Sequence, residues 1–343
     1  MGSFPLGFFG AMTPPSSKKP QLLIVELWGL GDLVIATPFL RAALQKFNIT
    51  VVAKPYAKEL QSRLWPGASV IPFVAPWTVF RRKYRIHRWP WREMFRLQRE
   101  VRGKGFDVGV SARWDPRDHF LLAFAGVKER FGFPRIGSQI FLSKALDRPE
   151  AAAHRYENWR TLGRAIGIEL PARENIVVPK RNGGDAGEIL VHTGAGQQVR
   201  VWPLESYRAL VAHLRQGQCR VRVVCDPDQR DWWLRNGESD VATPRSVAEL
   251  FVLLDHASAL IGNDSGPGHL AAVMGVPTFT IFGPQLPEWF APLHPVAKWL
   301  DGKACPYKPC SDYCRFARPV CLEGWAEAEV WPRIESFVKE ASA

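Results

Sequence analysis

The stretch Leu260-Ile261-Gly262-Asn263-Asp264-Ser265-Gly266-Pro267-Gly268-His269-Leu270-Ala271-Ala272 decides the fold. It lies between two apolar runs, and its pattern is a strand, a glycine-rich polar turn and the start of a helix. Such a turn points backbone N–H groups outward at a helix N-terminus, where the partial positive charge favours a phosphate. The stretch therefore predicts a pyrophosphate site. The alternative is a turn that only caps its helix through Asp264 and Ser265.

Strands and helices alternate along the rest of the chain in two successive runs. The pairs of strand and helix that open these runs lie at 22–27 with 33–47, and at 189–192 with 205–215. This alternation is typical of parallel sheets with crossover helices. We therefore expect an α/β fold of two Rossmann-like domains, with a last helix that can pack back on the N-terminal domain. The expected parts are a loose tail, an N-terminal domain and a C-terminal domain, at 1–20, 21–175 and 176–343.

Three polar turns follow predicted strands, at 28–33, 193–200 and 263–269. Ligands of open parallel sheets bind beyond the carboxyl ends of the strands. Because the first turn belongs to one domain and the other two belong to the next, the cleft between the domains is the expected active site.

The composition excludes a membrane-spanning protein. The chain has 343 residues, of which 46% are hydrophobic, but no apolar run reaches the ~18–20 residues that a bilayer requires. Its first residues lack the charged start of a signal peptide, so we expect a cytoplasmic protein.

The net charge of +12 is concentrated between Thr78 and Lys104, which contribute +8 of it. Tryptophan, tyrosine and phenylalanine residues are interleaved with these cations. The mixture predicts a surface for anionic lipid or a phosphorylated glycolipid at the membrane. A solvated helix face is the alternative, and nucleic acid is disfavoured because no nucleic-acid motif accompanies the charge. The candidate acceptor-binding cations are Arg81, Arg82, Lys83, Arg85 and Arg88.

Three motifs occur in order along the chain. They are Gly31-Asp32-Leu33-Val34-Ile35-Ala36-Thr37-Pro38, then His192-Thr193-Gly194-Ala195-Gly196 with Arg200-Val201-Trp202-Pro203, and then Asn263 to Pro277. Together they resemble glycosyltransferase family 9, the heptosyltransferases of lipopolysaccharide assembly. The resemblance implies a GT-B fold, with an acceptor domain facing a nucleotide-sugar donor domain across a cleft. It also implies inverting transfer of heptose from ADP-L-glycero-D-manno-heptose to a lipopolysaccharide core acceptor, with no metal or other cofactor.

The same resemblance assigns roles to individual residues. Asp32 matches the family's catalytic base, although it could instead only cap its helix. Gly31 matches the acceptor side of the site. The residues that match the donor side are Thr193, Gly194, Ala195, Gly196, Arg200, Gln229, Asp264, Ser265, Gly266, Gly268 and His269.

Three positions depart from the family pattern. Arg200 stands where a phosphate-binding lysine is usual. Its guanidinium keeps the positive charge of the lysine and presents its N–H donors in a planar fork. Trp28 stands just before the glycine of the first turn, where the family often has small hydroxylated residues. Gln229 lies nearest the ribose-binding glutamate, with Asp226 or Asp228 as possible substitutes. The donor's base and sugar are therefore less defined than its diphosphate, and another nucleotide sugar or a non-catalytic glycolipid-binding relative remains an alternative.

Four of the six cysteines cluster late in the chain with the spacing C-x4-C-x3-C-x6-C. Four thiolates could hold zinc or form two disulfides, but the C-x2-C pairs of common zinc ribbons are missing. We expect a structural loop, with a metal site as the weaker candidate. The residues are Cys305, Cys310, Cys314 and Cys321.

Overall fold

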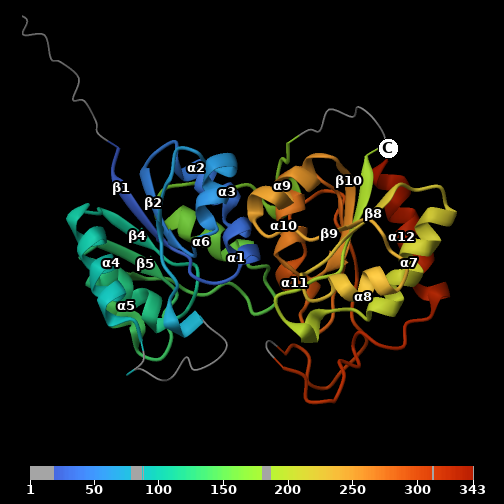
Figure 1. Ribbon diagram of the computed structural model, residues 1–343. Coiled ribbons are helices and arrows are strands. Elements are labelled where there is room, and N and C mark those ends of the chain that lie inside the picture. Colours follow the sequence, from blue (N-terminus) through green and yellow to red (C-terminus); the bar gives the residue numbers. More distant parts are fainter. Residues whose placement is uncertain (1–18, 79–86, 88, 180–186, 311–312, 343) are drawn as a thin grey trace, which may run out of the picture.

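Two parallel sheets of six strands carry the fold in the residues that the computed structural model describes. Those residues are 19–78, 87, 89–179, 187–310 and 313–342. The first sheet has the order β3-β2-β1-β4-β5-β6, and the second has the order β12-β11-β10-β7-β8-β9. The predicted α/β architecture of two Rossmann-like domains, the GT-B fold, is confirmed (Figure 1).

The N-terminal sheet consists of short strands whose residues are largely buried, as expected for parallel strands with helices on both faces. Its strands are β1 Gln21–Val25, β2 Asn48–Ala53, β3 Ser69–Pro72, β4 Val108–Val110, β5 Glu129–Gly132 and β6 Lys144–Ala145. Its helices are α1 Leu30–Ile35, α2 Thr37–Ala43, α3 Ala57–Leu64, α4 Trp91–Gly103, α5 Pro116–Phe124 and α6 Tyr156–Ala165. Single 3-10 turns lie at η1 Pro76–Thr78, η3 Ser138–Phe141 and η4 Arg173–Asn175.

The C-terminal sheet repeats this arrangement. Its strands are β7 Glu188–His192, β8 Val221–Val224, β9 Val241–Ala242, β10 Ala257–Asn263, β11 Thr278–Ile281 and β12 Lys298–Leu300. Its helices are α7 Leu204–Gln216, α8 Arg230–Arg235, α9 Val247–Asp255, α10 Gly266–Val273, α11 Pro287–Phe290 and α12 Glu327–Ala341, with a 3-10 turn at η5 Gln198–Arg200.

Each sheet has one point where the strand order reverses direction. In the first sheet β1 lies between β2 and β4, and in the second β7 lies between β8 and β10. Beyond the carboxyl ends of such strand pairs the connections diverge and leave a crevice, which is where α/β proteins bind ligands. The fold therefore directs attention to the segments that follow β1, β4, β7 and β10.

The single helix expected at 33–47 is in fact two helices, α1 and α2, joined at Ala36. Pro38 lies in the first turn of α2. Because proline has no N–H to donate to the carbonyl four residues earlier, it favours a new helix start at this position. The break leaves α1 short, with its N-terminus at the crevice.

The last helix lies on the C-terminal domain and does not return to the N-terminal one (Figure 1). Its buried residues Val330, Ile334 and Phe337 join the core beneath β10 and β12. The expectation that it packs back is therefore wrong. Among the described residues, no helix is both long and apolar enough to cross a membrane.

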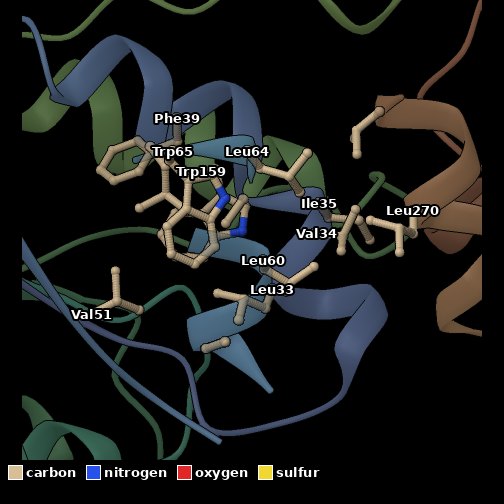
Figure 2. Packing of buried hydrophobic residues seen from close by; sticks show 14 of the residues in the cluster. Leu33, Val34, Ile35, Phe39, Val51, Leu60, Leu64, Trp65, Trp159 and Leu270 are labelled. Atoms are coloured by element: carbon tan, nitrogen blue, oxygen red, sulfur yellow. The ribbon is translucent and has the colours of Figure 1, made fainter. Parts of the chain in front are cut away.

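The two domains share an apolar contact. Helix α1 packs against α10, and the buried cluster that contains Val34 and Ile35 of α1 also contains Leu270 of α10 (Figure 2). Since both helices start at the crevices of their own sheets, this contact brings the two helix N-termini together.

Candidate active site

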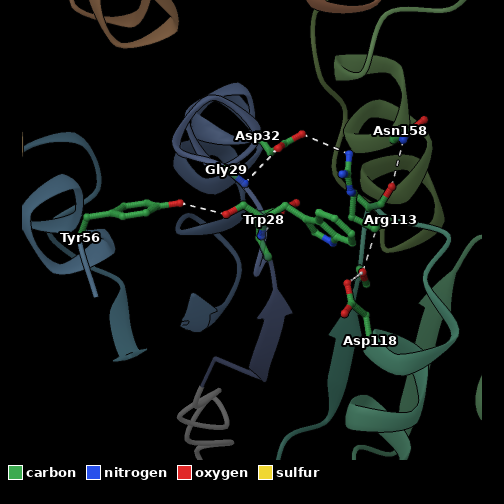
Figure 3. Close-up of polar contacts among 10 residues, drawn as sticks. Trp28, Gly29, Asp32, Tyr56, Arg113, Asp118 and Asn158 are labelled. Atoms are coloured by element: carbon green, nitrogen blue, oxygen red, sulfur yellow. Dashed lines mark hydrogen bonds and ion pairs between the residues drawn. The ribbon is translucent and has the colours of Figure 1, made fainter. Parts of the chain in front are cut away.

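Asp32 lies at the N-terminus of α1, directly beyond β1. Its carboxylate accepts a hydrogen bond from the backbone N–H of Gly29 at 3.1 Å and one from Arg113 Nη1 at 3.2 Å (Figure 3). The side chain is 21% exposed. Asp32 therefore caps its helix, as the alternative interpretation expected, and its carboxylate also remains accessible.

Arg113 comes from the segment that follows β4, the neighbour of β1. Its guanidinium lies 4.5 Å from the ring of Trp28, measured from Cζ to the ring centroid. The two residues come from the two strand ends that meet at the crevice. Arg113 was not predicted from the sequence, although the strand-end rule applied to residues 108–113 identifies it.

A small pocket adjoins Asp32 on the N-terminal side. It is lined by Glu26, Asp32, Ile35, Ala112, Arg113, Arg155, Asn158 and Trp159. Glu26 is 2% exposed and accepts a hydrogen bond from the N–H of Trp28 at 3.2 Å. Burial, together with the negative charge of Asp32, raises the pKa of Glu26 from its ordinary 4.5 to about 8. The pocket therefore holds a carboxyl group that binds its proton much more tightly than a free one does.

This proton makes the stability of the fold depend on pH. Because the folded protein holds the Glu26 proton more tightly than the unfolded chain does, the free energy of unfolding falls as pH rises from 4.5 to about 8. Glu26→Gln removes this contribution of up to ~1.4 kcal/mol per pH unit. We expect the variant to gain stability relative to the wild type between pH 5 and pH 8, measured by urea unfolding. Parallel pH curves for the two proteins would contradict the assignment.

The two donor-side turns are joined by one buried amide. Asn263, at the end of β10, donates from Nδ2 to the carbonyls of Thr193 at 2.9 Å and Gly194 at 3.2 Å. Its Oδ1 accepts from the N–H of Trp202 at 2.9 Å and the hydroxyl of Tyr207 at 2.8 Å. All four hydrogen-bonding positions of this side chain are used. Asn263 therefore fixes the turn after β7 against the turn after β10, a role that was not predicted from the sequence.

Arg200 and Asp264 form an ion pair at this junction. Arg200 Nη1 lies 3.2 Å from Asp264 Oδ2, and the Asp264 side chain is 4% exposed. Burial raises the pKa of Asp264 to about 6, while the charge of Arg200 opposes the rise. The Arg200 side chain is 27% exposed, so part of it remains accessible. Trp202 is buried against Tyr207.

The N-terminus of α10 meets the N-terminus of α1 across the domain contact. Ser265 precedes α10, and its side chain makes no capping hydrogen bond to the first turn of this helix. A methyl group added at Gly266 would lie 2.8 Å from Leu30, and one added at Gly31 would lie 2.7 Å from the ring of His269. Glycine is therefore required on both sides of the contact.

His269 is neutral in this position. Its side chain is buried, its Nδ1 has no hydrogen-bond partner among the described residues, and burial lowers its pKa to about 4. The negative charge of Asp32, on the facing helix, opposes this lowering of the His269 pKa. The structure thus brings together Asp32, Arg113, Arg200, Asp264, Ser265, Gly266 and His269 from both domains.

Gln229 is engaged by Thr193, in the turn that follows β7. Its Oε1 accepts from the Thr193 hydroxyl at 2.8 Å and its Nε2 donates to the Thr193 carbonyl at 3.2 Å. Asp226 accepts from the N–H of Ala195 at 3.1 Å. Both side chains therefore shape the 193–196 turn, and Gly194 leaves no room for a side chain against Asp226.

The remaining predicted residues are the acceptor-binding cations and the cysteines. Arg81, Arg82, Lys83, Arg85 and Arg88 fall outside the described residues. The thiols of Cys305, Cys310, Cys314 and Cys321 are free, and Cys321 is buried in the core of the C-terminal domain. Within the described ranges no group of three or more His, Cys, Asp or Glu side chains is arranged to hold a metal ion.

Comparison with known proteins gives consistent matches. The family model of glycosyltransferase family 9 (heptosyltransferase) matches residues 94–318. Lipopolysaccharide heptosyltransferase 1 of Pseudomonas aeruginosa strain PAO1 is 24% identical over 328 residues, which cover 85% of this chain and 89% of that protein. Lipopolysaccharide heptosyltransferase 3 of Escherichia coli K12 is 29% identical over 104 residues, 28% of this chain and 30% of that protein. The solved structure of E. coli heptosyltransferase WaaC with ADP has a TM-score of 0.69 at 17% identity, covering 94% of this chain and 99% of that chain.

Proposed function

Since the chain belongs to glycosyltransferase family 9, we propose that it transfers a heptose, with inversion, from ADP-L-glycero-D-manno-heptose to a phosphorylated lipopolysaccharide core acceptor. The observation that carries this proposal is that Asp32 of the N-terminal domain faces Arg200 and His269 of the C-terminal domain across the domain contact. A base on one domain faces a cluster of phosphate-binding groups on the other. The solved relative that contains ADP supports adenine as the donor's base.

Asp32 acts as the general base. It accepts the proton of an acceptor hydroxyl while that oxygen attacks the anomeric carbon of heptose from the face opposite the diphosphate. Positioned base catalysis of this kind contributes about 10²–10⁴-fold to rate. Arg113 donates to one carboxylate oxygen of Asp32 and Gly29 donates to the other, so the group is held in one orientation.

The diphosphate leaves with the electrons of the broken bond, and positive groups stabilise its charge. The uncapped N-terminus of α10 supplies backbone N–H donors, and Arg200 supplies a fixed positive charge. His269 is neutral at physiological pH, so it contributes a hydrogen bond rather than a charge. Asn263 holds a second donor-side loop in place through the carbonyls of Thr193 and Gly194. This loop consists of Thr193, Gly194, Ala195 and Gly196.

Calorimetry with the purified protein tests the donor assignment. We expect ADP to bind more tightly than UDP or GDP, without added metal and with little change when Mg²⁺ is present. Preference for UDP or GDP would retain the fold and replace the sugar donor. If no nucleotide binds, the chain is a non-catalytic glycolipid-binding relative.

The acceptor defines where the protein works. A lipopolysaccharide core under assembly is attached to a lipid that anchors it in the inner membrane. We therefore propose a peripheral protein on the cytoplasmic face of that membrane. The cation-rich stretch 78–104 supports this location.

A further inference from the structure

An exposed row of aromatic rings connects α4, α5 and η3 on the N-terminal domain. Phe95 of α4 is 52% exposed and Phe120 of α5 is 44% exposed. Ring centroids lie 6.4 Å apart between Phe95 and Phe124, 5.3 Å between Phe124 and Phe120, and 5.5 Å between Phe120 and Phe141. Four rings from three elements thus form a continuous apolar surface.

Two isoleucines, one within η3 and one just before it, are also exposed. Ile140 is 75% exposed and Ile136 is 83% exposed. Ile136 also has a φ of 52°, in the left-handed region that β-branched residues rarely adopt. The chain therefore holds a large apolar side chain in water in a strained conformation, with no burial within the protein to offset the strain.

The exposed face of α4 combines these rings with positive charge. At 100° per residue, the side chains that lie within about 60° of Phe95 are those of Trp91, Arg92, Gln98, Arg99 and Arg102. The two acidic residues of the helix, Glu93 and Glu100, lie on the other side. Arg92, Arg99 and Arg102 are exposed, and Trp91 is 41% exposed.

We propose that this surface, formed by Trp91, Arg92, Phe95, Arg99, Phe120 and Ile140, docks the protein onto an anionic lipid bilayer. The inference rests on the proposed function, because it places the N-terminal domain against the membrane that holds the acceptor. Aromatic rings bury themselves at the depth of lipid headgroups, and adjacent arginines bind the headgroup phosphates. A second copy of the chain is a poorer occupant, since two such faces would bring like charges together.

Vesicle sedimentation tests the docking surface. The full chain is mixed with vesicles of phosphatidylcholine alone, or with about one third phosphatidylglycerol, and the bound fraction is measured against lipid concentration. We expect binding to the anionic vesicles only, weakened at least tenfold in the variant Phe95→Ser/Phe120→Ser. The variant Arg92→Gln/Arg99→Gln should lose most of the preference for anionic lipid.

A matched control replaces exposed aromatic residues of the C-terminal domain. Trp299 and Phe316 are 40% and 41% exposed, and Trp299→Ser/Phe316→Ser should bind vesicles as the wild type does. Thermal unfolding and ADP calorimetry should show that the variants fold and retain the donor site. Equal vesicle binding by Phe95→Ser/Phe120→Ser and the control would overturn the inference.

Other outcomes separate the inference from the proposed function. If the wild type does not bind anionic vesicles but glycosylates a delipidated core acceptor, the inferred docking surface is overturned and the proposed transferase function is retained. If vesicle binding is lost in the phenylalanine variant while no nucleotide binds the wild type, the docking surface stands and the transferase is wrong. If light scattering shows a wild-type dimer that the phenylalanine variant converts to monomers, with vesicle binding unchanged, the surface joins two copies instead.

Discussion

Asp32→Asn is expected to lower turnover by ~10²–10⁴-fold while leaving the fold and the affinity for ADP as in the wild type. Asparagine keeps the size of the side chain, and its carbonyl oxygen can still accept the N–H of Gly29, which the aspartate accepts at 3.1 Å. The helix start is therefore preserved. What is lost is the ability to take a proton from the acceptor hydroxyl.

Asp107→Asn provides the matched control. Asp107 also accepts a backbone N–H, from Gln21 at 2.9 Å, and also pairs with a cation, Lys128 at 2.8 Å. It precedes β4, at the end of the sheet opposite the crevice. A structural effect of losing a carboxylate would appear in both variants, whereas a catalytic effect appears only in Asp32→Asn. Turnover that is unchanged in Asp32→Asn would exclude Asp32 as the base.

The alternation of strands and helices was sufficient to predict both sheets. Parallel strands read as short apolar runs, and most of them are followed by a helix, so local patterns specify the order of elements. The glycine-rich turn after β10 was predicted correctly for the same reason, since its helix start is local. The break at Ala36 was missed because apolar spacing continues through Pro38, and the missing N–H of the proline decides the boundary.

The contacts that complete the candidate site are distant in sequence. Arg113 lies 81 residues after Asp32 and reaches it only because β4 pairs directly with β1. The amide of Asn263 bonds to a carbonyl 70 residues earlier. Such pairings follow from the order of strands within a sheet, which the alternation of elements does not specify. The contact between Gly31 and His269 depends further on how the two domains pack.

Arg200→Ala is expected to lower kcat by ~10²–10³-fold, the usual effect of removing a preorganised donor from a developing negative charge, and to weaken the binding of ADP. The loss has two possible sources. One is the missing contact to the diphosphate. The other is the carboxylate of Asp264, which lies 3.2 Å from the guanidinium and would become a buried, unpaired charge beside the nucleotide.

The double variant Arg200→Ala/Asp264→Asn separates these two sources. Without Arg200 the pKa of Asp264, already raised to about 6 by burial, rises further, so the single variant should bind ADP better at pH 5.5 than at pH 8. Replacing Asp264 removes that pH dependence. If ADP affinity then returns to the wild-type value, Arg200 only neutralises Asp264. We expect the affinity to stay low, because a neutral amide restores no positive charge, and Arg200→Lys to recover part of it, since an ammonium supplies charge without the planar fork.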